Sequence, residues 1–514
     1  VYPSWVVGPD DPKCTPPHKL IRDFVAKGQR FWFLGGISVA HVEDVAEAHV
    51  SAFEVGAPRG RYVLGGANLT FRSFYNLLAQ FSGRKAPRIE LSKRVMVTLA
   101  DAAKLVFRLI RSEPPVDPQY VRTIVGSYSW FDSRRAIEEI GYNIRSAENS
   151  LSEAVSHARM RIAGTHELNL RTADADYSCG PAEELLLITG APGWLGNRII
   201  DVLVNGDRFG KSYQPRRVRL LVHPSLRGLL KLPSAFEIIY CDINDKCGVA
   251  RALAGVTVVY HLAGTIWPPR SEALYRVNAQ GTNTLVEACI ETGVRRLLFM
   301  STDSTCGHGN RAQRVFDEHT PARPYRDYGK SKRQAEECLL NADAEGHLDV
   351  TILRGFWFFG PYAPPRQLGF IRMFSWPRQL VFGNGKNLRS ISHVDNVVDA
   401  FFKAENNQSS FGKWYWVGDV QGGQTVDTIY QIVADTLRMP FRPLYVPVLI
   451  CRIFNVVDLA LSHFGRIQPT IYSAGKFHYD IAGRSDAAMR DFGYDPRATL
   501  QDAVREMSDM IGSL

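Results

Sequence analysis

The chain has 514 residues, 45% of them hydrophobic and 22% charged, which excludes a disordered protein and leaves room for two or three domains. Its net charge of +9 suits an anionic cofactor, substrate or membrane surface, but no dense run of lysine and arginine is present, so we expect no nucleic-acid partner. The eight cysteines are scattered without a CxxC pair, and no secretory leader opens the sequence. We therefore expect reduced thiols, no metal site and a cytoplasmic protein.

The first part of the chain repeats part of the second. VYPSWVVGPDDP at 1–12 matches LRGFWFFGPYAP at 353–364, and HVEDV at 41–45 matches HVDNV at 393–397. Both matches have an offset of 352 residues, and further short matches keep it. One constant offset across separate matches indicates an internal repeat.

The two copies are unequal in what precedes them. The second copy follows residues 183–352, which carry the motifs described below, whereas the first copy follows nothing comparable. We therefore expect 1–165 to be the C-terminal half of a module whose N-terminal half is absent, with no nucleotide loop and no redox activity of its own. A truncated sequence and a genuine orphan half docked on the intact module both stay open. Residues 166–182 lack apolar periodicity and predict a linker, followed by a complete module over 183–514.

Short apolar runs alternate with helical stretches throughout the complete module. The runs are LLLIT (185–189), VRLLV (218–222), EIIY (237–240), VVYHLA (258–263), RLLFMS (296–301) and VTILRG (350–355). Nearly continuous apolar strands that alternate with helices predict an α/β fold, in which a doubly wound parallel sheet is covered on both faces.

A glycine-rich string, TGAPGWLG at 189–196, directly follows the first of these runs and opens a helix. Glycines allow the tight turn and the close approach of a pyrophosphate to the helix N-terminus. Because both the strand and the helix are in place, the string predicts a dinucleotide site rather than a mere turn. The residues that we expect to bind the cofactor here are Gly190, Gly193, Trp194, Leu195 and Gly196.

The end of the second run bears on the choice between NAD and NADP. An acidic residue there would bind the ribose 2′-hydroxyl of NAD, but LVHPSLR at 221–227 has none. His223, Ser225 and Arg227 can instead meet a 2′-phosphate, which favours NADP slightly over NAD. Arg227 as a solvated surface residue is the alternative.

Two further motifs predict proton transfer. In YGKSK at 328–332, Tyr328 and Lys332 are four apart on a helix, so the ammonium group can lie beside the phenol. A nearby cation lowers the pKa of a phenol, which would allow Tyr328 to exchange a proton with a substrate hydroxyl. Thr302 follows the fifth strand, where its hydroxyl can orient the substrate oxygen.

Together these motifs resemble the extended short-chain dehydrogenase/reductase family, which includes NAD-dependent epimerases and dehydratases and the 3β-hydroxysteroid dehydrogenases. The resemblance covers 183–514 and implies a Rossmann-type sheet with a smaller C-terminal substrate-binding subdomain. It makes Thr302, Tyr328 and Lys332 the catalytic residues, with Lys332 also holding the ribose. It further implies contacts to the cofactor from Asp242, Ile243, Leu262, Ala263 and Gly264. Threonine in place of the usual serine at 302, and Gly355 in place of the usual proline, are departures that remove no required group.

Within the family, the sequence resembles the 3β-hydroxysteroid and sterol-carboxylate dehydrogenases, alongside enzymes similar to dihydroflavonol reductase. Apolar residues at helical spacing in 446–457, and in a counterpart at 95–110, predict amphipathic helices that pack on the domain, roof an apolar pocket or rest on a membrane surface. We therefore expect an NAD(P)-dependent oxidoreductase that interconverts an alcohol and a ketone on a lipid-like or sterol-like small molecule. A nucleotide-sugar epimerase or dehydratase with tightly bound NAD, and a non-catalytic NADP-binding scaffold or sensor, are the alternatives. Peripheral membrane contact and a homodimer stay open as partners.

Overall fold

The computed structural model describes residues 1–9, 15–57, 59–98, 101, 118–163, 184–211, 216–227, 236–268, 270–310 and 313–512. The chain divides into two compact units, 1–163 and 164–513. The predicted linker at 166–182 and most of the predicted helix at 95–110 lie outside the described residues.

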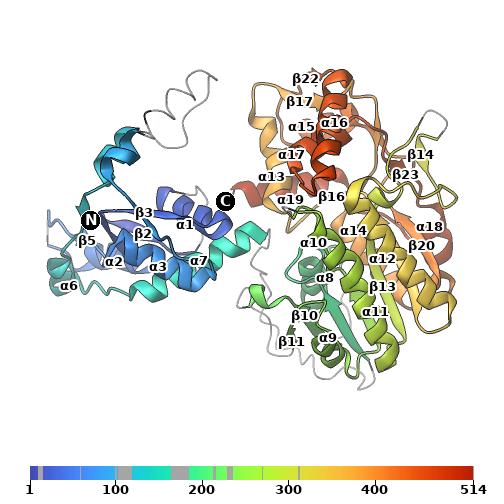
Figure 1. Ribbon diagram of the computed structural model, residues 1–514, viewed down its shortest axis with the longest axis horizontal. Helices are drawn as coiled ribbons and strands as arrows, with labels where there is room; N and C mark the ends of the chain where they lie inside the picture. Colours follow the sequence, from blue (N-terminus) through green and yellow to red (C-terminus); the bar gives the residue numbers. More distant parts are fainter. Residues whose placement is uncertain are drawn as a thin grey trace. The chain divides into compact units, whose positions relative to one another are not determined.

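The second unit is built on a seven-stranded sheet of order β11-β10-β9-β12-β13-β15-β20, and every neighbouring pair is parallel (Figure 1). The strands span Leu185–Thr189 (β9), Arg217–Val222 (β10), Glu237–Tyr240 (β11), Val258–His261 (β12), Arg296–Thr302 (β13), Asp349–Gly355 (β15) and Lys413–Val417 (β20). The strand order reverses between β9 and β12, and ligands of doubly wound sheets bind at such a switch point. The predicted α/β fold with a parallel Rossmann-type sheet is confirmed.

Helices cover both faces of this sheet, as the apolar strands require. Buried side chains of α8 (Trp194–Asn205) and α14 (Val394–Glu405) pack on one face. Those of α9 (Lys246–Leu253), α11 (Gly281–Thr292) and α12 (Arg326–Ala344) pack on the other. The packed side chains between the helices and the sheet hold the carboxyl ends of the strands in place.

A smaller part lies at the carboxyl end of the sheet (Figure 1), and its segments come both before and after β20 along the chain. Its helices are α13 (Pro365–Arg372), α15 (Val426–Thr436), α16 (Val448–His463), α17 (Pro469–Lys476) and α19 (Leu500–Gly512), whereas α18 (Asp486–Phe492) packs on the sheet beside β20. Its short strands pair as β14 (Val315–Phe316) with β23 (Ala482–Gly483), β16 (Trp357–Phe359) with β19 (Ile391–His393), β17 (Gln379–Phe382) with β22 (Pro443–Val446), and β18 (Leu388–Arg389) with β21 (Gln424–Thr425). The helix predicted at 446–457 is α16.

The first unit is a smaller α/β arrangement. Its main sheet joins β2 (Trp5–Val7), β4 (Gly36–His41) and β6 (Ala67–Thr70), with β8 (Tyr128–Ser129) also on β4. Two further pairs join β1 (Tyr2–Pro3) to β5 (Val63–Leu64) and β3 (Phe31–Phe33) to β7 (Ile89–Leu91). Among the described residues its helices include α1 (Pro16–Lys27), α2 (Val42–Glu54), α3 (Phe71–Ser82), α5 (Pro118–Ile124), α6 (Arg134–Ile140) and α7 (Ala147–Ala163).

The two units share local structure at the offset of the sequence repeat. Trp5 pairs with Val39 in parallel strands, and Trp357 pairs with Ile391 in the same way 352 residues later. His41 and His393 each cap the following helix through the ring. These matches support the repeat, while the assignment of 1–165 to a substrate-binding half stays a prediction.

Candidate active site

The glycine-rich loop joins the carboxyl end of β9 to the N-terminus of α8, as predicted. Gly190 has a φ of +88°, and a Cβ there would lie 2.6 Å from both the Ala263 nitrogen and the Leu262 carbonyl carbon. A Cβ at Gly193 would lie 2.5 Å from the Gly190 oxygen. Side chains are therefore excluded where a pyrophosphate needs backbone contact, so the loop fits a dinucleotide.

A buried polar chain ties the loop to the neighbouring strand. The Thr189 hydroxyl accepts hydrogen bonds of 3.1 Å from the backbone nitrogens of Leu262 and Ala263, and it lies 2.8 Å from Nδ1 of His261. The other ring nitrogen of His261 lies 2.9 Å from the Thr282 hydroxyl. Burial lowers the pKa of His261 to about 3, so the ring is neutral and holds the two strand ends together.

The residues predicted for the adenosine end lie at the ends of β10 and β11. Burial raises the pKa of Asp242, but hydrogen bonds from Asn244 outweigh it, so the carboxylate stays charged. Nε2 of His223 lies 3.7 Å from this carboxylate. The Arg227 guanidinium lies 4.6 Å from the centre of the Tyr240 ring. His223 and Arg227 thus have protein partners, and their placement gives no support to a preference for NADP.

The three predicted catalytic residues line one cavity of about 800 Å³. Thr302 ends β13, while Tyr328 and Lys332 lie on the first turns of α12. Four of the predicted cofactor residues also line this cavity: Trp194, Leu195, Leu262 and Gly264. The cavity thus opens from the dinucleotide switch point.

The effect of Lys332 on the pKa of Tyr328 stays a prediction. Burial raises the pKa of Tyr328 to about 12, and the Thr302 hydroxyl and the charge of Arg366 only partly oppose it. The Lys332 ammonium donates a 2.8 Å hydrogen bond to the Met300 carbonyl and lies 3.9 Å from the centre of the Phe299 ring. The ammonium thus contacts β13, and the spacing of four residues alone could not reveal this contact.

A buried ion pair lies one turn beyond Lys332. Nη2 of Arg354 lies 2.6 Å from the Glu336 carboxylate, and both side chains are at most 1% exposed. The Ser301 hydroxyl donates a 2.6 Å hydrogen bond to the same carboxylate. Burial lowers the pKa of Lys332 to about 7, and the charge of Glu336 opposes the fall. Glu336 therefore fixes α12 against β13 and β15.

Close packing leaves no room for a side chain at Gly355. A Cβ there would lie 2.4 Å from Cε1 of Phe358 and 2.7 Å from Cε of Met300. Both neighbours line the cavity. The glycine at 355, where the family usually has proline, thus lets Phe358 and Met300 form this part of the cavity wall.

Apart from Lys332, sequence reasoning missed the basic side chains of the cavity. Arg389 is 6% exposed, and its Nε has no hydrogen-bond partner among the described residues. The Lys476 ammonium is 2.8 Å from the Ser304 hydroxyl and 3.3 Å from the Asp303 carboxylate. Arg366 also lines the cavity. These residues come from segments far apart in the chain, and no spacing rule could have grouped them.

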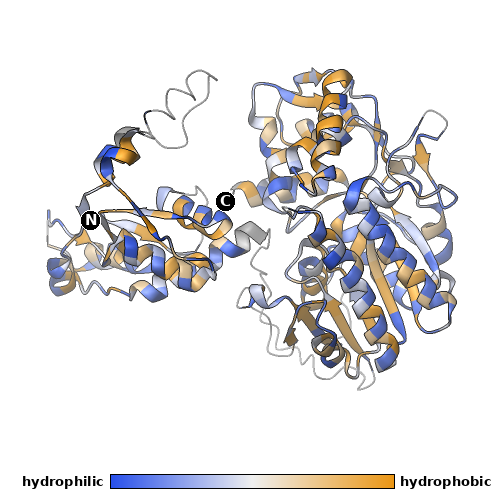
Figure 2. Ribbon diagram, viewed as in Figure 1, coloured by the Kyte–Doolittle hydropathy of each residue, from blue (hydrophilic) through white to orange (hydrophobic). Residues whose placement is uncertain are grey.

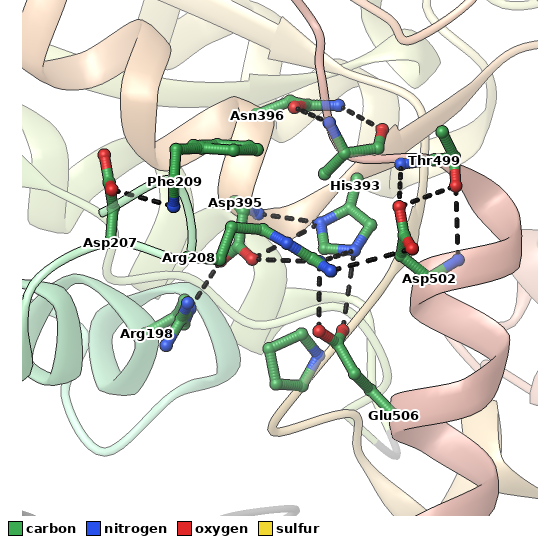
Figure 3. A network of polar contacts seen from close by, with 12 residues as sticks. Arg198, Asp207, Arg208, Phe209, His393, Asp395, Asn396, Thr499, Asp502 and Glu506 are labelled. Carbon is green, nitrogen blue, oxygen red and sulfur yellow. Dashed lines mark hydrogen bonds and ion pairs between the residues drawn. The ribbon is translucent and has the colours of Figure 1, made fainter. Parts of the chain in front are cut away.

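A second polar cluster lies at the start of α14, away from the cavity. His393, Asp395 and Glu506 approach one another closely enough to hold a metal ion. Nη1 of Arg208 instead lies 3.1 Å from His393, 3.4 Å from Asp395 and 3.0 Å from Glu506 (Figure 3). The Arg208 guanidinium supplies the positive charge that a metal ion would bring. Its contacts join Glu506 of α19 to His393 and Asp395 at the start of α14.

A known protein family matches the part of the chain that carries Thr302, Tyr328 and Lys332. Residues 186–418 match the model of the NAD dependent epimerase/dehydratase family. The uncharacterized protein y4nL of Sinorhizobium fredii is 30% identical over 337 residues, which are 63% of this chain and 94% of that protein. UDP-glucose 4-epimerase of Vibrio cholerae is 27% identical over 62% of this chain and 93% of that protein. The 3beta-hydroxysteroid-dehydrogenase/decarboxylase isoform 1 of Arabidopsis thaliana is 26% identical over 65% of this chain and 80% of that protein.

A solved structure agrees on the fold. MoeE5 in complex with UDP-glucuronic acid and NAD superimposes with a TM-score of 0.50 at 22% identity, over 64% of this chain and 99% of that one. The expected resemblance is confirmed by the family model and the relatives. The chain belongs to the NAD-dependent epimerase/dehydratase family of extended short-chain dehydrogenases/reductases.

Proposed function

We propose that the chain is an oxidoreductase that interconverts an alcohol and a ketone on a lipid-like or sterol-like substrate, with Tyr328 as acid and base. The observation that carries this proposal is the gathering of Thr302, Tyr328 and Lys332 on one cavity at the switch point of the sheet. A proton relay serves no purpose in a scaffold or sensor, which needs only the nucleotide pocket.

The roles of the residues follow from their positions. The Thr302 hydroxyl holds the substrate oxygen at the end of β13, and the Tyr328 phenol exchanges the proton with it. Lys332 lines the same cavity and would hold the ribose of the cofactor. The backbone at Gly190 and Gly193 would hold the pyrophosphate of a nicotinamide cofactor, which would supply or accept the hydride.

The cavity wall supports a flat, apolar substrate. Its lining includes a set of large aromatic side chains: Trp267, Phe356, Trp357, Phe358, Phe370, Phe382, Tyr472 and Phe477. Aromatic side chains offer broad apolar contact to rigid rings. The Arabidopsis relative is named a 3beta-hydroxysteroid dehydrogenase, and that name agrees with this chemistry.

A nucleotide-sugar epimerase or dehydratase is the second candidate. Arg389 favours it, because a buried guanidinium with an unpartnered Nε in the cavity can bind a phosphate or carboxylate of the substrate. The Vibrio relative, a UDP-glucose 4-epimerase, has this class of activity. An acidic sterol-like substrate would make apolar contact with the aromatic wall and place its negative charge beside the Arg389 guanidinium.

Two measurements separate these candidates. Mass spectrometry of ligands that co-purify with the protein would identify the cofactor and any sugar nucleotide or lipid. Net change of absorbance by reduced nicotinamide on mixing with hydroxysteroids is expected for the first candidate. Tightly retained NAD with no net change, together with conversion of a UDP-sugar, would refute it in favour of the second.

The remaining partner assignments are proposals as well. NAD is the cofactor that the family uses, and NADP can be tested beside it in the same assay. We propose peripheral contact with a membrane through an amphipathic helix, and a homodimer. No helix among the described residues is long and apolar enough to cross a membrane.

A further inference from the structure

Helix α16 presents apolar side chains outward. It packs against α17, yet most of its large apolar residues are at least 40% exposed. The most exposed are Leu449 (69%), Ile453 (55%), Val456 (67%) and Leu459 (55%), followed by Phe464 (76%) just beyond its end. Figure 2 shows hydrophobic colour along most of this helix. Several adjacent apolar side chains of this size mark an interaction surface rather than ordinary surface variation.

The exposed surface extends onto the strand before α16 and onto its partner strand. β22 carries Leu444 and Tyr445, which are 43% and 44% exposed. β22 pairs with β17, and Trp376, 53% exposed, lies just before β17. We call Trp376, Leu444, Tyr445, Leu449, Ile453, Val456, Leu459 and Phe464 the apolar patch.

Arginines accompany the apolar patch, and acidic residues are scarce in the same segments. Segments 361–390 and 437–470 contain one acidic residue, Asp458, which is buried and bonded to Arg326 at 2.8 Å. The exposed arginines of these segments include Arg372, Arg378, Arg438, Arg442, Arg452 and Arg466. The charges of these segments are therefore mainly cationic, and an acidic residue in contact with the patch is Asp427, whose carboxylate accepts a 3.1 Å hydrogen bond from Tyr445.

We propose that the apolar patch docks on a lipid bilayer that contains anionic headgroups. Apolar side chains of such a helix enter the boundary between headgroups and acyl chains, while long arginine side chains reach the phosphates. Each arginine near an anionic surface adds attraction. A second copy of the chain is a poorer occupant, because a twofold interface would set this arginine-rich surface against itself.

Docking would bring the membrane next to the substrate cavity. α17, against which α16 packs, contributes Pro469, Tyr472 and Lys476 to the cavity lining. A lipid-like substrate could then pass from the bilayer without crossing water. This last step rests on the proposed function, whereas the docking itself does not.

Co-sedimentation with vesicles tests the docking. The full chain should bind vesicles of phosphatidylcholine with phosphatidylserine more tightly than vesicles of phosphatidylcholine alone, and salt should weaken the binding. Ile453→Glu with Val456→Glu should weaken binding at least about tenfold, because charges would enter the apolar boundary. Arg442→Gln with Arg452→Gln should reduce the preference for phosphatidylserine. Phe53→Glu, at a 91% exposed apolar position on α2, is the matched control and should bind as the wild type does.

The same experiments can overturn the proposal. Failure of the wild type to bind either vesicle, or equal binding by the α16 variant, refutes it, and NAD binding by each variant verifies folding. A wild-type dimer that the α16 variant converts to monomers, without any vesicle binding, would assign the patch to a second copy. Vesicle binding without turnover of any hydroxysteroid would leave the docking standing and contradict the proposed function.

Discussion

The Lys332→Met variant is expected to be more stable than the wild type at neutral pH and to have lost activity. Lys332 is 5% exposed, and within the described part of the chain its ammonium has a single hydrogen bond, to the Met300 carbonyl. Its charge therefore loses hydration that one carbonyl and one aromatic ring do not replace. Methionine keeps the length of the side chain without the charge.

The size and the sign follow from the pKa of Lys332. Folding lowers it from 10.5 to about 7, so between these values the unfolded chain binds more protons. The free energy of unfolding therefore rises with pH from about 7 to about 10.5, because of this group. At pH 7 the burial of this side chain costs about 4 kcal/mol, an order-of-magnitude figure from the usual conversion of pKa to free energy. Methionine removes that cost.

Urea unfolding followed by tryptophan fluorescence measures the effect. The wild type should gain stability between pH 7 and pH 10, while Lys332→Met should start higher and lack this part of the rise. Lys330→Met, at an exposed position on the same helix, is the control and should keep the wild-type slope. Equal pH slopes in the wild type and Lys332→Met would refute the reasoning.

Three further predictions concern the frame of the site. Glu336→Ala leaves the Arg354 guanidinium buried without its partner and should lower the free energy of unfolding by about 3–5 kcal/mol in urea melts, whereas an effect below 1 kcal/mol would contradict the pairing. Arg208→Ala should cost about 2 kcal/mol, since it leaves carboxylates crowded around His393, and an unchanged urea midpoint would disprove that role. Arg227→Ala should change the KM for NAD by no more than about threefold, the size of its stacking on Tyr240, and a larger loss in steady-state assays would place it on the cofactor.

The sequence predicted the sheet well because its strands are nearly all apolar. All six runs became strands of the parallel sheet, with ends that agree within two residues. The seventh strand, β20 (KWYWV), was missed, because its three consecutive aromatic residues differ from the aliphatic runs of the others.

The candidate site was predictable only where the residues follow a strand or share a helix face. Thr302, Tyr328 and Lys332 meet these conditions, and they line one cavity. The direction of the Lys332 ammonium was not predictable, because it depends on a carbonyl of β13 that a pattern of side chains does not specify. Arg389 and Lys476 reach the cavity only through the packing of the smaller C-terminal part.

The central claim is that the Tyr328 phenol transfers the proton during reduction or oxidation of the substrate. Tyr328→Phe removes only the hydroxyl, so NAD should still bind, as titration of the bound nucleotide would verify. Turnover should fall by about 10²–10⁴-fold, the usual contribution of a positioned proton donor. A Tyr328→Phe protein that turns over substrate at close to the wild-type rate would contradict the account.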